Sequence, residues 1–184
     1  MISDGYLDGA KKDCAGHNPA APHSGGKDYL YEGGTRIPFI VSWPGHIQQG
    51  GKSDVLIGQI DLIRTLATLT GAPIPAGQCK DSQEQLDALM GKDTHGRDWL
   101  ITQTNGGAAL ALRVGHFKLI PGKKDQLFDL SQDIAEKHNI AAECPEIVEG
   151  MKAAMKEIQA ANYTADRLQL DLSPLLKLME QRGK

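Results

Sequence analysis

The chain has 184 residues, enough for one compact domain or for a domain with an appendage. Apolar residues make up 40% and charged residues 23%, which is the composition of a globular protein and not of a disordered one. The net charge of −3 argues against a dedicated nucleic-acid-binding protein, because such proteins carry a basic excess. No stretch approaches the roughly 18 consecutive apolar residues of a membrane span. Neither nucleic acid nor a membrane is therefore an expected partner.

The N-terminus and the cysteines say little about the compartment. Residues 1–6 have no basic region followed by an apolar core, so a signal peptide is not predicted. The three cysteines are odd in number and widely spaced, which does not suggest a disulfide framework: Cys14, Cys79 and Cys144. The sequence therefore does not indicate a cellular compartment.

Residues 3–35 are predicted to form one long loop, because they show neither helical nor strand periodicity. A loop of this length without structure of its own is uncommon in a compact domain and tends to be functional or misassigned. It carries Cys14, His17 and His23, but no fourth ligand and no known zinc spacing accompany them. Exposed loop residues are therefore favoured over a metal site.

Lys27 lies on a glycine-rich stretch just before a short apolar run, residues 38–43, that is suited to a buried strand. A lysine on such a loop can present a cation to an oxyanion. Taken alone, a lysine in this position is more often a solvated surface group.

A second apolar run, residues 56–60, predicts a strand beside residues 38–43. Asp61 is expected to cap a helix through Leu69 by accepting an amide of its first turn, and Gly71 suits the residue that follows this helix. This arrangement is typical of the edge of an α/β sheet.

From Trp99 the hydrophobic periodicity changes from that of helices to that of strands. A capping box beginning at Ser82 first predicts a short helix that Gly91 closes. Pro145 fits the first turn of a later helix that runs to residue 160, and a second apolar set after residue 174 indicates a terminal helix. Between them, four strands joined by glycine-bearing turns are expected to pair antiparallel: residues 99–104, 108–114, 117–120 and 126–130.

Four segments together resemble motifs of the sulfatases, the arylsulfatase-type sulfuric ester hydrolases. Residues 26–45 are similar to the family's G-K-x-x-x-x-E-G-G-x-R-x-P motif. Residues 59–66 are similar to Q-I-D-L-x-P-T-L, with Arg64 where proline is usual. Residues 111–120 resemble A-x-R-x-G-x-x-K-L-I, and residues 126–141 resemble E-L-Y-D-L-x-x-D-P-x-E-x-x-N-L-A. The matches occur in the family's order, which makes their combination specific.

The resemblance implies an α/β fold class. We expect the edge of an alkaline-phosphatase-like α/β sheet, followed by a small C-terminal subdomain of about four antiparallel strands packed on a helix. The implied division is residues 1–95 for the C-terminal end of the sulfatase core, 96–162 for the subdomain and 163–184 for a tail. The larger, earlier part of a sulfatase has no counterpart in these residues.

The resemblance also implies a partial catalytic site. Sulfatases use a formylglycine made from Cys or Ser in a C-x-P-x-R motif, beside a calcium ion. No cysteine or serine here has that context. Lys27 matches the family lysine that contacts the sulfate, where an ammonium stabilises the charge that develops on the leaving oxygen. Asp4 resembles a calcium ligand, but Gly5 stands where a second oxygen ligand is expected, so an ordinary turn aspartate is an equal alternative.

Other charged residues of the motifs are expected to be structural. Arg113 and Lys118 are predicted to form a cross-strand pair. Asp129 and Asp133 are expected to organise the turn after the last strand.

The main hypothesis is the C-terminal part of a sulfatase that hydrolyses sulfate monoesters with calcium as cofactor, the chain alone being catalytically incomplete. It predicts exposed apolar surface and self-association through an exposed sheet edge. The alternative is a non-catalytic module that binds a sulfated ligand or a partner chain, which predicts a soluble monomer. A third hypothesis, another phosphoryl- or sulfuryl-transfer branch of the alkaline-phosphatase-like enzymes, shares the fold. Family members are often exported or periplasmic, but the chain itself gives no localisation.

Overall fold

The computed structural model describes residues 20–164 and 170–182. The expectations for Asp4, Cys14 and His17 concern residues outside this part of the chain. The described residues divide into two compact units. The first contains residues 20–38, 101–152 and 175–182, and the second contains residues 39–100, 153–164 and 170–174.

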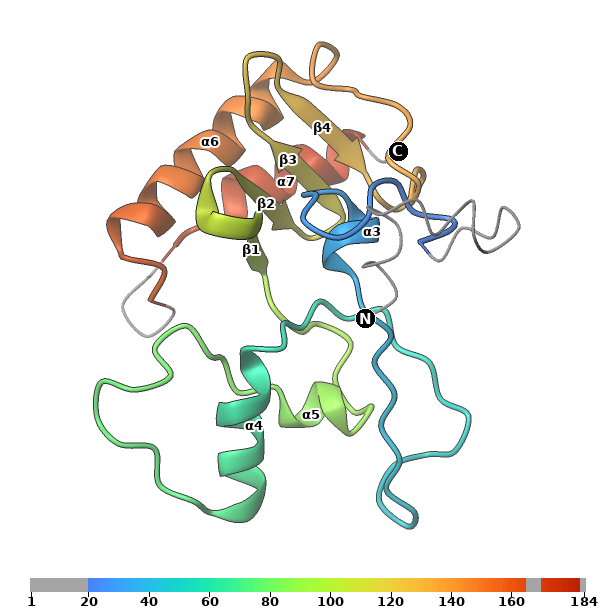
Figure 1. Cartoon of the computed structure of the whole chain (residues 1–184), viewed down its shortest axis with the longest axis vertical. Helices are drawn as coiled ribbons and strands as arrows, with labels where there is room; N and C mark the ends of the chain where they lie inside the picture. Colours follow the sequence, from blue (N-terminus) through green and yellow to red (C-terminus); the bar gives the residue numbers. More distant parts are fainter. Residues whose placement is uncertain (1–19, 165–169, 183–184) are drawn as a thin grey trace. The chain divides into compact units, whose positions relative to one another are not determined.

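A four-stranded sheet in the order β1-β2-β3-β4 organises the first unit (Figure 1). The β2–β3 and β3–β4 pairs are antiparallel, with Leu112 opposite Leu119 and Leu119 opposite Leu127. Gly115 has a φ of 55° in the tight β2–β3 turn, where glycine is favoured. The four expected strands are thus confirmed, with these bounds: β1 Trp99–Gln103, β2 Leu110–Val114, β3 Phe117–Ile120 and β4 Gln126–Asp129.

The two faces of the sheet differ in chemistry. All four residues of β3 are buried, and because side chains alternate along a strand, Lys118 and Ile120 share one face while Phe117 and Leu119 share the other. On the first of these faces Ile120 belongs to a buried cluster that includes Leu30 and Phe128. The face that carries the buried cation is therefore covered by the segment around residue 30.

Parts of two helices complete the first unit: α6 (Pro145–Ala160), through residue 152, and α7 (Ser173–Arg182), from residue 175. Pro145 begins α6 as expected, and the predicted terminal helix is present. An ideal Cβ on Gly150 would lie 2.9 Å from Leu175 Cδ1, so the glycine lets α7 approach α6 closely. Apolar side chains of both helices are buried: Ile147, Val148, Met151, Leu175 and Met179.

The second unit contains α4 (Asp61–Thr70) and the short α5 (Leu86–Leu89). Gly71, with a φ of 69°, follows α4 as predicted. The expectation that Asp61 caps the first turn is wrong. No side chain caps this helix, because the Asp61 carboxylate instead accepts from the amides of Gly58 (2.8 Å) and Gln83 (2.9 Å) and pairs with Arg97.

The predicted capping box before α5 is also wrong. The Ser82 hydroxyl accepts a hydrogen bond from the Arg64 amide at 3.2 Å, and Gln85, the residue before α5, makes no side-chain capping bond. The short helix itself is present, and Gly91 follows it with a φ of 72°. Ser82 therefore makes a tertiary contact with α4 instead of the expected local capping contact with α5.

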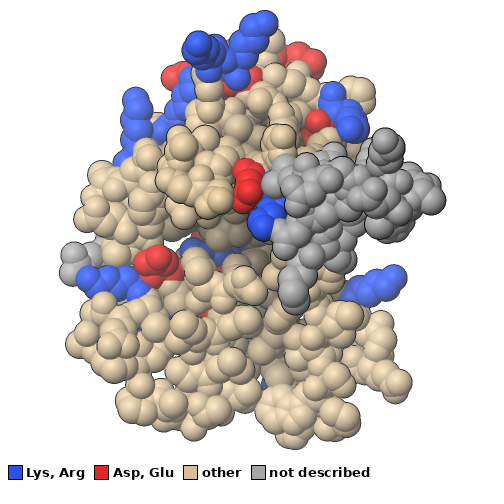
Figure 2. All heavy atoms as spheres, viewed as in Figure 1, with Lys and Arg blue, Asp and Glu red and all other residues tan. Residues whose placement is uncertain are grey.

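The two apolar runs predicted as strands are not strands in the described residues. A single parallel bridge joins Leu56 to Gly96, and residues 38–43 have no ladder at all. Ile40 is 89% exposed. A strand makes its hydrogen bonds along a neighbouring strand, and neither run has a partner strand among the described residues, apart from the single bridge at Leu56. Figure 2 shows few charged side chains on the viewed face over α4 and residues 39–60.

The predicted long loop also contains one helical turn, α3 (Glu32–Thr35). No helix among residues 20–164 and 170–182 is both long and apolar enough to cross a membrane.

Candidate functional site

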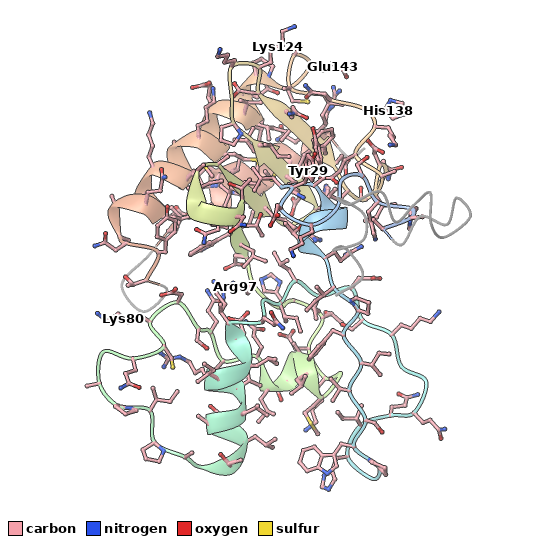
Figure 3. All side chains as sticks on the ribbon, in the orientation of Figure 1. Tyr29, Lys80, Arg97, Lys124, His138 and Glu143 are labelled. Carbon is pink, nitrogen blue, oxygen red and sulfur yellow. The ribbon has the colours of Figure 1, made fainter. Side chains whose placement is uncertain are left out.

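The structure places Lys27 on a tight, exposed turn just before α3. The Tyr29 amide donates to the Gly26 carbonyl at 3.1 Å, so Lys27 and Asp28 form the tip of the turn. Asp28 has a φ of 71°, the left-handed conformation that such a reversal uses and that aspartate tolerates better than most residues. Figure 3 labels Tyr29 beside α3. The turn presents the Lys27 side chain at the surface.

The double glycine of α3 lets that turn lie directly on the helix. An ideal Cβ on Gly34 would lie 2.3 Å from both the Gly26 and the Tyr29 carbonyl oxygens, and one on Gly33 would lie 2.5 Å from the Ser24 carbonyl oxygen. These distances leave no room for a side chain. The Gly33 amide also donates to the Ser24 carbonyl at 2.8 Å, which closes the base of the loop. The position of the Lys27 turn is therefore tied to α3.

Beneath α3 lies a buried carboxylate–lysine cluster, which consists of Glu32, Lys118 and Glu136. Lys118 Nζ lies 2.9 Å from Glu32 Oε1 and 2.9 Å from Glu136 Oε1. The Glu32 amide donates to Glu136 Oε2 at 2.6 Å. The three side chains are 5%, 2% and 0% exposed in that order. One ammonium from β3 thus serves two carboxylates that are 104 residues apart in the sequence.

Two arginines lie near the Glu32 end of this cluster. Arg113 Nη1 is 3.7 Å and Arg36 Nε is 3.6 Å from Glu32 Oε2. Arg113 stands directly opposite Lys118 in the β2–β3 register, which confirms the predicted cross-strand pair. The sequence did not reveal that Glu32 lies beside both cations.

The pKa values of the two carboxyl groups of the cluster are shifted in opposite directions. For Glu32, burial raises the pKa, but the charge and hydrogen bond of Lys118, with help from Arg113 and Arg36, bring its pKa below the ordinary value. For Glu136, burial dominates and raises the pKa. Glu136 Oε1 is close to Lys118 Nζ but lacks a well-directed hydrogen bond. Glu136 is therefore the less stabilised anion.

The start of the loop is held by the segment that carries Glu136. The Ser24 hydroxyl donates to the Ala135 carbonyl at 2.6 Å, and His23 Nδ1 lies 3.2 Å from the Ile134 carbonyl oxygen. Lys137 Nζ in turn donates to Ser24 Oγ at 3.0 Å. Residues 23–32 are therefore attached to this segment near both ends.

The turn after β4 is organised by the aspartates that the sequence indicated. Asp133 accepts hydrogen bonds from the Lys137 and His138 amides, both at 2.7 Å. Asp129 accepts from the Ser131 amide at 3.0 Å. This confirms the structural role predicted for both carboxylates, which hold the segment containing Glu136 in place.

Asn139 is a structural residue that the sequence reasoning missed. Its Oδ1 accepts from the amides of Leu127 and Ala141, both at 3.0 Å, and its Nδ2 donates to the Asp125 carbonyl at 3.0 Å. It thereby attaches the same segment to β4. The motif containing Glu136 and Asn139 was the signal that pointed to both.

The second unit has its own buried ion pair, which we call the Asp61–Arg97 pair. Its side chains are 2% and 1% exposed, and Arg97 Nη1 lies 2.5 Å from Asp61 Oδ1. Arg97 also donates to the Trp99 carbonyl at 3.0 Å and to the Asp81 carbonyl at 3.2 Å. Arg64, which departs from the family's proline, donates to the Ser82 carbonyl at 2.8 Å. These are structural contacts.

The part of the chain that the structure describes contains no metal site, and the hollow beside α4 does not include Lys27. No group of three His, Cys, Asp or Glu side chains among those residues is arranged to hold a cation. Asp4 lies outside them. A hollow of about 420 Å³ lies beside α4 and is lined by uncharged residues that include Ile63, Leu66, Pro73 and Cys79.

Comparisons with known proteins agree on one group of enzymes. A family model described as "N-sulphoglucosamine sulphohydrolase, C-terminal" matches residues 25–161. An N-acetylgalactosamine-6-O-sulfatase of Bacteroides thetaiotaomicron is 36% identical over 176 residues, which cover 86% of this chain and 34% of that protein. Human arylsulfatase A is 29% identical over 161 residues, which cover 69% of this chain and 31% of that protein.

A solved structure gives the same result for the fold. It comes from work on the metabolism of multiple glycosaminoglycans by Bacteroides thetaiotaomicron. It aligns with a TM-score of 0.77 at 36% identity and covers 87% of this chain and 36% of that one. The chain therefore spans about a third of the length of these curated relatives.

Proposed function

The chain belongs to the sulfatase family and corresponds to the C-terminal region of its members; on that premise we propose that it forms part of an enzyme that hydrolyses sulfate monoesters, and that Lys27 contacts the sulfate. The observation that carries this proposal is the exposed turn of Lys27, which lies within the matched residues 25–161 and is held by the family's own Glu-Gly-Gly sequence.

The reaction is the hydrolysis of a sulfate ester, R–O–SO₃⁻ + H₂O → R–OH + HSO₄⁻. The sulfur–oxygen bond to the alcohol breaks, and the alcohol oxygen gains a proton. An ammonium fixed near that oxygen stabilises the negative charge that develops on it before the proton arrives. Because Lys27 stands on a turn whose backbone is fixed by α3, its amine reaches the sulfate without first ordering a loop.

The nucleophile and the metal are proposed to come from outside the described residues. The chain contains no C-x-P-x-R sequence, so we expect it to be inactive by itself. Calcium would supply charge neutralisation at the sulfate when bound, and Asp4 is the residue of this chain proposed to bind it. The exposed apolar run at residues 39–43 supports this view, because it is strand-like in sequence and pairs with no strand among the described residues.

A graft tests the proposal. This chain would replace the aligned C-terminal third of the Bacteroides thetaiotaomicron relative, and hydrolysis of an aryl sulfate and of a 6-O-sulfated N-acetylgalactosamine would be measured. We expect turnover, with the sulfated sugar preferred, and a loss of kcat in Lys27→Ala on the order of 10²–10³. Lys124→Ala is the matched control, because Lys124 is an exposed lysine on the β3–β4 turn, away from Tyr29 (Figure 3). An active graft that tolerates Lys27→Ala would refute the role of Lys27.

The alternative is a non-catalytic module that binds a sulfated ligand or a partner chain, for which the exposed Lys27 turn is the anion-binding feature. It predicts that the purified chain is a stable monomer that binds a sulfated ligand. Size-exclusion chromatography with a dye for apolar surface separates the two proposals. Dye binding and self-association of the chain would support the sulfatase region over the independent module.

A further inference from the structure

We propose that the buried carboxylate–lysine cluster is a positioning device for the Lys27 turn, through which β3 and residues 133–137 fix where the Lys27 amine is presented. This inference rests on the proposed function only for the sulfate that the amine would meet. The contacts that carry it belong to the first unit alone. Glu32, Lys118 and Glu136 are positioning residues here and not catalytic ones.

The loop that carries Lys27 is attached at both ends to the same segment. Ser24, before the Lys27 turn, donates its hydroxyl to the Ala135 carbonyl at 2.6 Å. Glu32, after the turn, donates its amide to Glu136 Oε2 at 2.6 Å. The two attachment points are therefore adjacent residues, and the loop leaves and returns to the same place. Such a closed loop has few conformations left to its tip.

Backbone contacts of α3 connect the cluster to the Lys27 turn. Glu32 begins α3, and the next two residues are the glycines on which the turn lies. A shift of Glu32 moves Gly34, whose Cα lies against the Gly26 and Tyr29 carbonyls that flank Lys27. Because these are backbone contacts, no side-chain rotation absorbs the displacement.

The cluster lowers the stability of the folded protein. Burial of three ionisable side chains carries a large desolvation penalty, which apolar side chains of the same size would avoid. Glu136 adds a φ of 52°, an unfavourable conformation for a residue with a side chain. A strained, charged cluster next to an exposed turn is more typical of a functional site than of a core made only for stability.

The cluster is too deeply buried to take a direct part in the reaction. The Lys118 and Glu136 side chains are 2% and 0% exposed, so a substrate arriving from solvent does not touch them. Lys27 is exposed. Any effect of the cluster on a bound sulfate is therefore indirect, and the Lys27 turn is the exposed element that lies on α3 above the cluster.

Hydrogen exchange of the full 184-residue chain, resolved by residue, tests the mechanical part without any sulfate. Glu136→Ala removes the acceptor of the Glu32 amide, whereas Glu136→Gln keeps an oxygen there. In Glu136→Ala we expect the Tyr29 and Gly33 amides to exchange at least about tenfold faster, while the β3 amides change less than about twofold. Glu136→Gln should restore most of the protection.

Ser24→Ala provides a second variant if Glu136→Ala does not fold, because Ser24 is only partly buried. It should accelerate exchange at the same two amides by at least about threefold. Uniform acceleration across Tyr29, Gly33 and β3, or no change at the first two, would overturn the inference. Failure of the sulfatase proposal looks different, since the graft would then be inactive or indifferent to Lys27 whatever the exchange rates are.

Discussion

The Asp61–Arg97 pair and the carboxylate–lysine cluster differ in how many of their polar atoms have hydrogen-bond partners. In the Asp61–Arg97 pair one acid meets one base, and both also bond to backbone groups. In the carboxylate–lysine cluster two acids share one lysine, and Glu136 Oε1 has no well-directed hydrogen bond. The first arrangement is that of a structural pair. The second retains an imbalance beside an exposed turn, where position matters more than stability.

The largest effect is expected for Arg97→Met, because it leaves the Asp61 carboxylate buried without its cation. Loss of one partner of a buried pair costs about 3–5 kcal/mol of the free energy of unfolding. Chemical denaturation measures this. Asp98→Asn is the matched control, because its partner His95 and Asp98 itself are 76% and 57% exposed, and we expect a change within about 0.5 kcal/mol. Equal effects of the two substitutions would contradict the structural role of the Asp61–Arg97 pair.

Gly34→Ala should have the next largest effect and tests the link between the cluster and the turn. The new methyl group would lie 2.3 Å from two carbonyl oxygens, and such overpacking costs about 1–3 kcal/mol. Gly51→Ala is the control, because its Cβ would lie 3.5 Å from the nearest atom, an ordinary contact. Thermal unfolding compares them. If Gly34→Ala were as harmless as Gly51→Ala, the turn would not lie on α3 as described.

The pH dependence of stability should distinguish the two acids of the cluster. The pKa of Glu32 is lowered in the folded protein, so its ionised form stabilises the fold above about pH 4.5, and this is lost as the pH falls through the lowered pKa. The pKa of Glu136 is raised, so its protonated form favours folding below about pH 4.5, and this is lost as the pH rises through the raised pKa.

Substitution by glutamine removes each titration in turn. The stability lost in Glu32→Gln should shrink toward acid, whereas Glu136→Gln should gain on the wild type as the pH rises above about 4.5. Urea unfolding at a series of pH values gives both difference curves. If the two difference curves sloped in the same direction, the pKa values of Glu32 and Glu136 would not be shifted in opposite directions.

The smallest effect is expected for Arg182→Ala. Arg182 Nη2 lies 2.6 Å from Glu143 Oε2, but the side chains are 44% and 62% exposed. Exposed pairs contribute about 0–1 kcal/mol, and this one should weaken further in 0.5 M salt. A loss comparable to that of Arg97→Met would show that exposure does not separate the ion pairs of this chain.

The sequence predicted the elements whose partners are close along the chain. The four strands pair with their neighbours through short turns, and Gly71 and Pro145 mark helix ends by local chemistry. It misassigned Asp61 and Ser82, because tertiary partners outcompeted the local amides. It also predicted strands at residues 38–43 and 56–60, where the apolar pattern has no partner strand among the described residues.

The candidate site was predicted only in part. The family motif singled out Lys27, and the structure places it on an exposed turn. The cluster beneath it was not foreseen, because Glu32, Lys118 and Glu136 are far apart in sequence and no periodicity relates them. A lysine inside an otherwise apolar strand was the one local sign that β3 covers a buried anion.

The most direct test of the account is a double-mutant cycle for kcat/KM in the sulfatase graft, with Lys27→Ala, Glu136→Ala and the two combined. If the cluster acts through the turn, Glu136→Ala should lower kcat/KM at least about tenfold when Lys27 is present and less than about twofold when Lys27 is already alanine. An equal loss in both backgrounds would contradict the account, because Glu136 would then affect the enzyme by a route that does not involve Lys27.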